Sequence, residues 1–217
     1  MQALNRQIKY WDSVAGRKKF THPLNTRSFQ ELVPKGSSIL DIGCGYGRLC
    51  QTLYESGYTD VIGIDMSPQM IREGINQFPH LNLKCLALEN MPVEENSFDV
   101  IILFAVLTCI PTDKGQLKLI DSVLRVLKPN GLIHVSDYFL QSDRRNRLRY
   151  DAYHRKYGVY GIFELDNGPV LRHHARPWMK TLLSPFHQLS REETTAPTMN
   201  GHSSVIFQYW GKKWKIP

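Results

Sequence analysis

Residues 38–53 read SILDIGCGYGRLCQTL, and this stretch decides the fold. An apolar run over 38–40 leads into a loop with three glycines in five positions, and an amphipathic stretch over 48–53 follows it. This order predicts a strand, a glycine-rich turn and a helix. Glycine lacks a Cβ, so a ligand can approach the backbone closely and the turn can adopt positive φ. Because the helix start also offers free N–H groups and the positive end of its dipole, we expect the loop to hold a nucleotide or a nucleoside with a polar tail.

Apolar runs and helical patterns alternate along the chain as far as residue 137. The runs that share a strand pattern are residues 38–42, 61–65, 82–86, 99–104 and 132–136. Helices are predicted over 116–127 and from Ser67-Pro68, where a capping residue precedes a proline suited to the first turn. Such alternation implies a mostly parallel sheet with helices on both faces, the α/β class.

The composition of the chain changes after Asp137. Residues 138–158 are polar and basic. A hairpin is predicted next, with strands over 159–165 and 170–174 around the turn Asp166-Asn167-Gly168. The remaining predicted elements are a short helix over 177–183 and two strands over 186–193 and 203–212.

The 217 residues suit one α/β domain with a sizeable core. Its predicted parts are a helical lead-in or lid broken at Pro23 (1–35), a ligand-binding core (36–137), an insertion (138–176) and a last helix with strands (177–217). The insertion has about 40 residues, which is too few for a core of its own. We therefore predict a single domain.

Composition narrows the setting in which the chain works. It has no apolar run of about 18 residues, and its first residues lack the apolar segment of a signal peptide, so no membrane association is expected. The four cysteines form no CxxC pair, which favours a reduced, cytoplasmic location without disulfides or a metal site. The net charge of +7 permits an acidic partner but does not require one.

The glycine loop is compatible with two kinds of ligand. A dinucleotide fold requires Gly-x-Gly-x-x-Gly, whereas here the third place of that pattern is Arg48. Asp65, at the end of the second predicted strand, suits the hydroxyls of a ribose in either case. Asp41 precedes the glycines, and its carboxylate would repel a pyrophosphate but attract an ammonium or sulfonium group. This favours S-adenosylmethionine.

The motifs resemble those of the class I S-adenosylmethionine-dependent methyltransferases, in order and at normal spacing over about residues 36–137. The matching stretches are SILDIGCGYGRL (38–49), VIGIDMSPQMI (61–71), ALENMPVEENSFDVIIL (87–103) and VLRVLKPNGLIHVSD (123–137). The resemblance implies a Rossmann-like, seven-stranded, mostly parallel sheet with helices on both faces, a helical N-terminal lid and an insertion after the fifth strand.

The resemblance also implies roles for single residues of the cofactor site. Gly43, Gly45 and the backbone of Cys44 are expected to line the methionine and ribose, and Asp41 to orient the amino group. Asp65 is expected to bind the ribose hydroxyls and Met66 to pack on the adenine.

At the adenine end, Ala87 stands where the family often has an aspartate, so one hydrogen bond is missing. The N–H of Leu88 can still serve the adenine ring. The other expected cofactor contacts are Tyr10, Glu89, Phe104 and Ala105.

The acceptor end is expected to involve the lid, the loop after the fourth strand and the insertion. Residues 10–24 resemble a lid of small, mostly uncharacterised bacterial methyltransferases; the alternative is a helix packed on the sheet. His22 and His173 are the candidate bases, needed if the acceptor is a hydroxyl or an acidic carbon. The candidate substrate contacts are Trp11, Thr108, Arg149, Tyr157 and His174.

These features predict in-line methyl transfer from S-adenosylmethionine to a small molecule, possibly an acidic one, with release of S-adenosylhomocysteine. One alternative is an RNA-modifying methyltransferase, in which the arginines of 144–149 follow the RNA backbone. Another is a module that binds the cofactor without catalysis. The acceptor atom and the choice between monomer and homodimer stay open.

Overall fold

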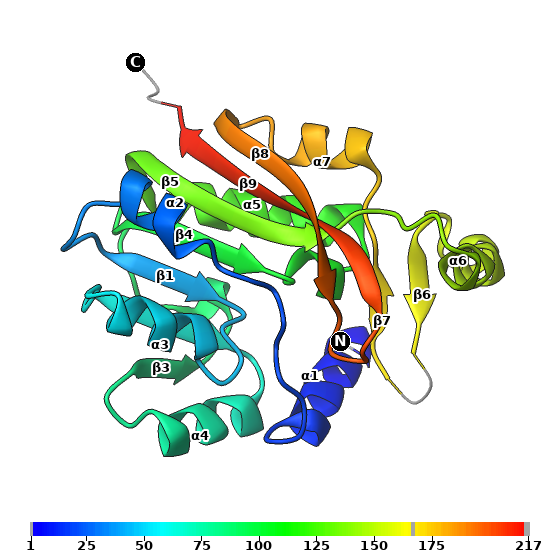
Figure 1. Ribbon diagram of the computed structural model, residues 1–217, viewed down its shortest axis with the longest axis horizontal. Helices are drawn as coiled ribbons and strands as arrows, with labels where there is room; N and C mark the ends of the chain where they lie inside the picture. Colours follow the sequence, from blue (N-terminus) through cyan, green and yellow to red (C-terminus); the bar gives the residue numbers. More distant parts are fainter. Residues whose placement is uncertain (1, 166–167, 215–217) are drawn as a thin grey trace.

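The computed structural model describes residues 2–165 and 168–214, and its centre is a seven-stranded sheet (Figure 1). The strands are β1 (Ile39–Ile42), β2 (Val61–Asp65), β3 (Asn82–Cys85), β4 (Phe98–Phe104), β5 (Leu127–Tyr138), β8 (Phe186–Pro197) and β9 (Ser203–Lys213). Their spatial order is β3-β2-β1-β4-β5-β9-β8. The first five are parallel, and β9 runs antiparallel to both β5 and β8. The predicted Rossmann-like sheet is confirmed.

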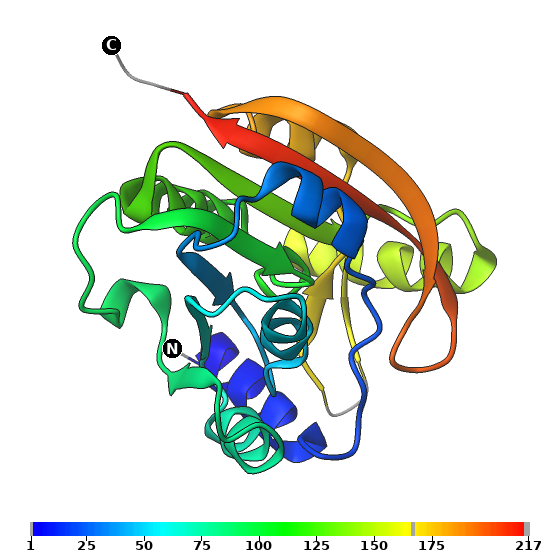
Figure 2. The same cartoon turned by 60° about the vertical axis from the view of Figure 1, so that its left-hand side comes forward.

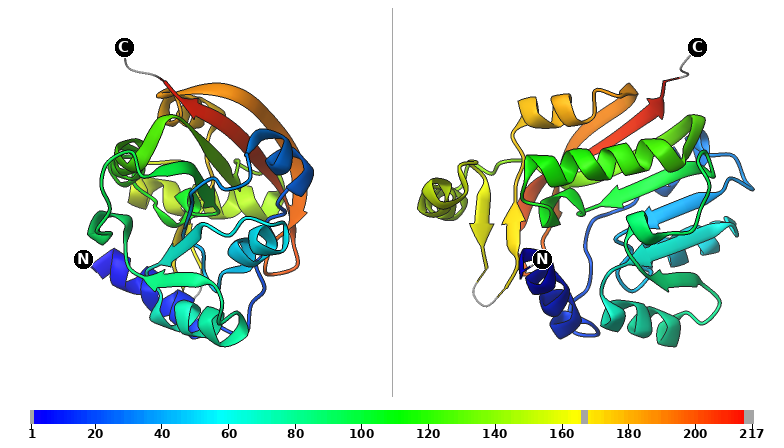
Figure 3. Two further views of the ribbon diagram at one scale, coloured as in Figure 1. Left: turned by 90° about the vertical axis from the view of Figure 1, so that its left-hand side faces the viewer. Right: turned by 180° about the vertical axis from the view of Figure 1, so that it is seen from behind.

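Helices cover both faces of the sheet, as the alternation predicts (Figure 3). One face packs against α2 (Thr26–Leu32) and α3 (Arg48–Glu55), and the other against α5 (Asp113–Val126) and α7 (Arg176–Leu182). The helix α4 (Pro68–Gln77) follows β2 and contacts β3. Ser67 caps α4, since its Oγ accepts from the Met70 N–H at 3.2 Å.

The helix α1 (Gln2–Val14) crosses the carboxyl ends of the parallel strands rather than packing on a face of the sheet (Figures 1 and 2). The Gln7 amide anchors it by donating to the carbonyls of Cys109 (3.0 Å) and Val170 (2.6 Å). The Asp12 carboxylate accepts from the Ser67 hydroxyl at 2.6 Å. Residues 18–25, between α1 and α2, form neither helix nor strand. We call this connecting segment the strap.

The insertion after β5 consists of α6 (Arg144–Tyr157) and a hairpin of β6 (Ile162–Glu164) and β7 (Val170–Arg172). The predicted hairpin is confirmed, although the turn residues 166–167 lie outside the described residues. A bridge between Phe139 and His174 joins it to the end of β5. The insertion therefore extends the carboxyl edge of the sheet and faces α1. No helix within the described ranges combines the length and apolar character needed to cross a bilayer.

Candidate active site

A cavity of about 460 Å³ lies where the carboxyl ends of β1, β2, β4 and β5 meet α1 and the insertion. Its walls come from segments far apart in the sequence. The lining residues are drawn from the segments 7–11, 20–22, 41–49, 64–70, 86–89, 104–110, 115–119, 138, 145–149, 163–165, 171–173 and 198–204. In an open parallel sheet this edge is where ligands bind.

The glycine loop has the tight turn that its sequence predicts. Gly43 and Gly45 have φ of 71° and 57°. A Cβ on Gly43 would lie 2.7 Å from Val106 Cγ2, and one on Gly45 would lie 1.9 Å from the Phe20 ring. Phe20 thus covers Gly45, which does not line the cavity. The sequence predicts instead that Gly45 contacts the cofactor. Gly43 and the Cys44 backbone do line the cavity.

Asp65 is held in a fixed orientation at the end of β2. Its Oδ2 accepts from the Gly45 N–H at 3.0 Å and its Oδ1 from the Ser67 N–H at 2.8 Å. Burial raises the pKa of Asp65, and these N–H donors oppose that rise. Both Asp65 and Met66 line the cavity. A rigid carboxylate at this point can receive two vicinal hydroxyls.

Asp41 is 1% exposed at the floor of the cavity. Its Oδ2 accepts from the Cys50 thiol at 3.5 Å. Burial raises the pKa of Asp41 to about 7, opposed by the thiol bond and by the nearby Arg48. Near pH 7 this carboxyl is therefore about half protonated, and the Cys50 thiol is only a weak hydrogen-bond donor to it. Such a carboxyl is suited to bind an ammonium group.

The adenine end expected from the motifs forms one wall of the cavity. Ala87, Leu88 and Glu89 all line it at the start of the short helix η1 (Leu88–Asn90). Glu89 pairs with Lys118 of α5 at 3.3 Å. Next to this wall, Phe104 and Ala105 also line the cavity, and Ala105 has a positive φ of 54° that turns the chain sharply after β4.

His22 lies on the strap and faces the cavity from the lid side. It is 4% exposed, and its Nδ1 is 3.0 Å from Ser136 Oγ. Its Nε2 has no hydrogen-bond partner among the described residues. Burial lowers the pKa of His22 to about 4, which the nearby Asp137 partly opposes. The ring is therefore neutral near pH 7, and with Nδ1 donating to Ser136 its Nε2 keeps a free lone pair.

His173 reaches the cavity from the insertion. Its Nδ1 is 2.6 Å from the Tyr150 hydroxyl, and its ring stacks on Tyr138 with centroids 5.1 Å apart. Burial, and then the charge of Arg149, lower the pKa of His173 well below its ordinary value. This histidine is also neutral near pH 7.

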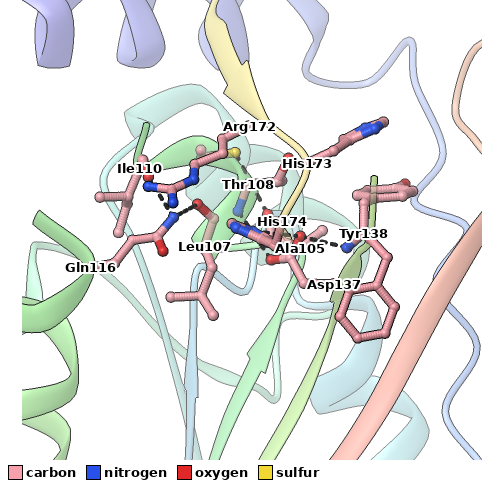
Figure 4. Close-up of polar contacts among 12 residues, drawn as sticks. Ala105, Leu107, Thr108, Ile110, Gln116, Asp137, Tyr138, Arg172, His173 and His174 are labelled. Carbon is pink, nitrogen blue, oxygen red and sulfur yellow. Dashed lines mark hydrogen bonds and ion pairs between the residues drawn. The ribbon is translucent and has the colours of Figure 1, made fainter. Parts of the chain in front are cut away.

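A polar network fixes the loop after β4, which includes the short helix η2 (Leu107–Cys109) (Figure 4). The buried Asp137 carboxylate accepts from the Thr108 N–H at 3.0 Å and from the Tyr138 N–H at 2.7 Å. The Gln116 amide donates to the carbonyls of Leu107 (3.0 Å) and Ile110 (2.7 Å). The loop that carries Thr108 is thus locked from two sides.

Two predicted substrate residues are placed differently from the expectation. His174 is fully buried and does not line the cavity; its Nε2 is 3.5 Å from Asp137 Oδ1, in the network below the cavity (Figure 4). Tyr157 lies off the cavity, where its hydroxyl donates to Glu164 at 2.6 Å. Tyr157 is thus bound to a neighbouring carboxylate, and His174 lies beside one, at positions that the sequence does not reveal.

The other predicted residues that line the cavity are Tyr10, Trp11, Thr108 and Arg149. Arg145, one of the arginines of 144–149, also lines it, and sequence reasoning did not single out Phe20, Tyr138, Phe163 or the tip of the β8–β9 hairpin (198–204), which line it as well. Phe20 had a usable signal, because it is an aromatic two residues before His22 in the lid. Within the described ranges no three His, Cys, Asp or Glu side chains converge as a metal ion requires.

Comparison with known proteins agrees with this geometry. A family model described as a methyltransferase domain matches residues 39–131. Over 134 residues the chain is 29% identical to a ubiquinone biosynthesis O-methyltransferase of Coxiella burnetii, covering 58% of this chain and 56% of that protein. It is 27% identical over 142 residues to a 2-methyl-6-phytyl-1,4-hydroquinone methyltransferase of Synechocystis, covering 64% and 44%. The chain thus spans about half the length of these curated relatives.

Among solved structures, a crystal structure described as a SAM-dependent methyltransferase from Methanosarcina mazei has the same fold. Its TM-score is 0.80 at 24% identity, covering 90% of this chain and 99% of that one. The motif order, the sheet order and the matching domain agree with one another. Residues 39–131 are therefore similar to a methyltransferase domain, and the chain has the fold of a SAM-dependent methyltransferase of known structure.

Proposed function

We propose that the chain transfers a methyl group from S-adenosylmethionine to a small-molecule acceptor. The observation that carries this proposal is that one cavity extends from the glycine loop to the aromatic residues of the lid and the insertion. One end offers Asp41 and Asp65, and the other offers two neutral histidines. A cavity of this kind, covered by α1, suits a small acceptor better than a polymer.

The residues present fit the cofactor. Asp41, whose carboxylate has only a thiol partner among the described residues, matches an amino group, and Asp65 matches the ribose hydroxyls. Arg48 lines the same end, and its Nε is buried without a partner among the described residues, so it matches the amino-acid carboxylate. When bound, the cofactor supplies an electrophilic methyl group on a sulfonium.

The chain's own contribution to catalysis is mainly positioning and exclusion of water. Such positioning can lower a barrier by about 7–11 kcal/mol when alignment is near ideal. The locked loop after β4 and the lid residues Trp11 and Phe20 restrict the cavity between cofactor and acceptor. His22 Nε2 would take the proton from an acceptor hydroxyl, because it is neutral, unpartnered and oriented by Ser136.

The two curated relatives support a small aromatic acceptor. Their names refer to O-methylation in ubiquinone biosynthesis and to methylation of a hydroquinone. The aromatic rings that line this cavity are Tyr10, Trp11, Phe20, Phe104, Tyr138 and Phe163. For RNA the support is weaker, because Arg145 and Arg149 face the cavity rather than forming one surface with Arg144 and Arg147.

The test is transfer of radiolabelled methyl from S-adenosylmethionine into a fractionated cell extract. We expect label in the small-molecule fraction with the wild-type protein and none with Asp65→Asn. Label confined to RNA or to protein would contradict the small-molecule acceptor. Tight binding of S-adenosylhomocysteine with no label in any fraction would show a module that binds without catalysis.

A further inference from the structure

The acidic side chains that line the cavity all lie at one end, together with the basic Arg48 and Lys118. These acids are Asp41, Asp65 and Glu89, at the cofactor end. The far end carries Arg149, with Arg145 one helical turn earlier on the same face of α6. The nearest buried acid there, Asp137, does not line the cavity and already accepts from two backbone N–H groups. This end is therefore positive.

The guanidinium of Arg149 is fixed by an aromatic ring and, within the described residues, keeps an unsatisfied donor. Its Cζ lies 3.5 Å above the centre of the Phe163 ring, so the guanidinium stacks on that ring. Its Nε is buried and has no hydrogen-bond partner in the described part of the chain. Burial lowers the pKa of Arg149, which measures the cost of holding this charge away from water.

The acids around α6 are already engaged with other groups. Asp143 caps the helix, accepting from the Asn146 N–H at 3.1 Å. Glu164 pairs with Lys156 and accepts from Tyr157. Within the described residues no carboxylate forms an ion pair with Arg149 or Arg145. A stacked, partly desolvated guanidinium that has no carboxylate partner is well suited to bind a planar anion by charge-assisted hydrogen bonds.

We propose that the acceptor carries an anionic group, a carboxylate or a phosphate, which Arg149 binds while Arg145 draws it in at the mouth of the cavity. This inference rests on the proposed function and specifies its substrate class. The walls beside Arg149 are apolar and come from Phe163, Leu165 and Leu171. The acceptor is thus an amphipathic anion whose apolar body lies between its charged group and the methylated atom.

The test is calorimetry with matched anionic and neutral probes, on protein saturated with S-adenosylhomocysteine. The pairs are benzoate and benzamide, 4-hydroxybenzoate and 4-hydroxybenzamide, indole-3-acetate and indole-3-acetamide, octanoate and octanamide, and phenyl phosphate and phenol. In the wild type we expect at least one anion to bind about tenfold more tightly than its neutral partner, as a charge-assisted pair requires. Arg149→Met keeps the stem on Phe163 but removes the charge, and should abolish this preference.

Arg147→Met is the matched control, because Arg147 is exposed on the same helix and does not line the cavity. It should keep the preference of the wild type. A panel in which no anion binds more tightly than its neutral partner, including one with no binding at all, would overturn the proposal. So would an undiminished preference in Arg149→Met. The affinity for S-adenosylhomocysteine, measured first, shows that each variant is folded; if it were absent in the wild type, the proposed function would fail and the pairs would be measured on the protein alone.

Discussion

The two ends of the cavity are built in opposite ways. The cofactor end is made mainly by the four loops that directly follow β1, β2, β3 and β4, and it holds all the acids that line the cavity. The acceptor end is assembled from the lid, the insertion and the β8–β9 tip, and it carries the charged Arg145 and Arg149 and the neutral His22 and His173. One edge of a sheet can therefore carry two kinds of site side by side. The geometry of local backbone turns forms the first, and side chains from distant segments form the second.

Substitution of His22 gives the largest expected effect and acts on the acceptor end alone. His22→Gln should lower methyl transfer to the acceptor fraction of the extract by about 100-fold or more, because it removes the proposed base. Its S-adenosylhomocysteine affinity should stay within about twofold, since no cofactor charge is paired with His22 in this account. Rates would be measured by label incorporation.

The pH dependence of the wild-type enzyme sharpens this prediction. The pKa of His22 is about 4, so its protonation should reduce the rate only below about pH 5. A His22→Gln enzyme that retained a third of the wild-type rate would show that the acceptor needs no base from this residue.

Asp41 should make cofactor binding depend on pH. Because its pKa is about 7 in the folded protein, the carboxyl holds a proton below neutral pH and loses it when an ammonium group binds. The affinity for S-adenosylhomocysteine should then rise about tenfold from pH 6 to pH 8, with proton release at the lower pH. Calorimetry in two buffers of different ionisation enthalpy measures this release. Asp41→Asn should bind with no proton release; if it released as many protons as the wild type, another group would be responsible.

The same pKa shift has a consequence for stability without ligand. The folded protein binds the Asp41 proton up to about pH 7, whereas the unfolded chain releases it near pH 4. The contribution of Asp41 to the free energy of unfolding is therefore present at pH 4 and is lost as the pH rises to 7. Opposing it, the lowered pKa of His22 makes its contribution present above pH 6.5 and lost as the pH falls toward 4.

The lid gives the smallest effect and links the two ends. The Phe20 ring stacks on Tyr46 with centroids 5.0 Å apart and covers Gly45. Phe20→Ala should weaken S-adenosylhomocysteine binding about fivefold, because it removes one aromatic contact over the loop. Lys19→Ala, at the exposed neighbouring position, should bind as the wild type does. Equal affinities for wild type and Phe20→Ala would mean that the lid belongs to the acceptor end only.

Most of the sheet and the cofactor end could be predicted from the sequence. Apolar runs, glycines and an acid at a strand end are local signals, and Asp41, Asp65 and Leu88 lie on the cavity as expected. Gly45, Tyr157 and His174 do not line the cavity, because distant residues lie against them: Phe20 on Gly45, Glu164 on Tyr157 and Asp137 beside His174. The hairpin tip at 198–204 carries no local sign that it meets the lid, where Lys18 donates to Asn200.

The most direct test of the central claim, two chemically opposite ends in one cavity, is the S-adenosylhomocysteine affinity of Asp65→Asn and Arg149→Met beside the wild type. Calorimetry should show a loss of about tenfold to a hundredfold for Asp65→Asn, since hydrogen bonds to a charged group are worth about 1.5–3 kcal/mol. Arg149→Met should bind the cofactor product as the wild type does. Equal losses in the two variants, or unchanged affinity in Asp65→Asn, would contradict the account.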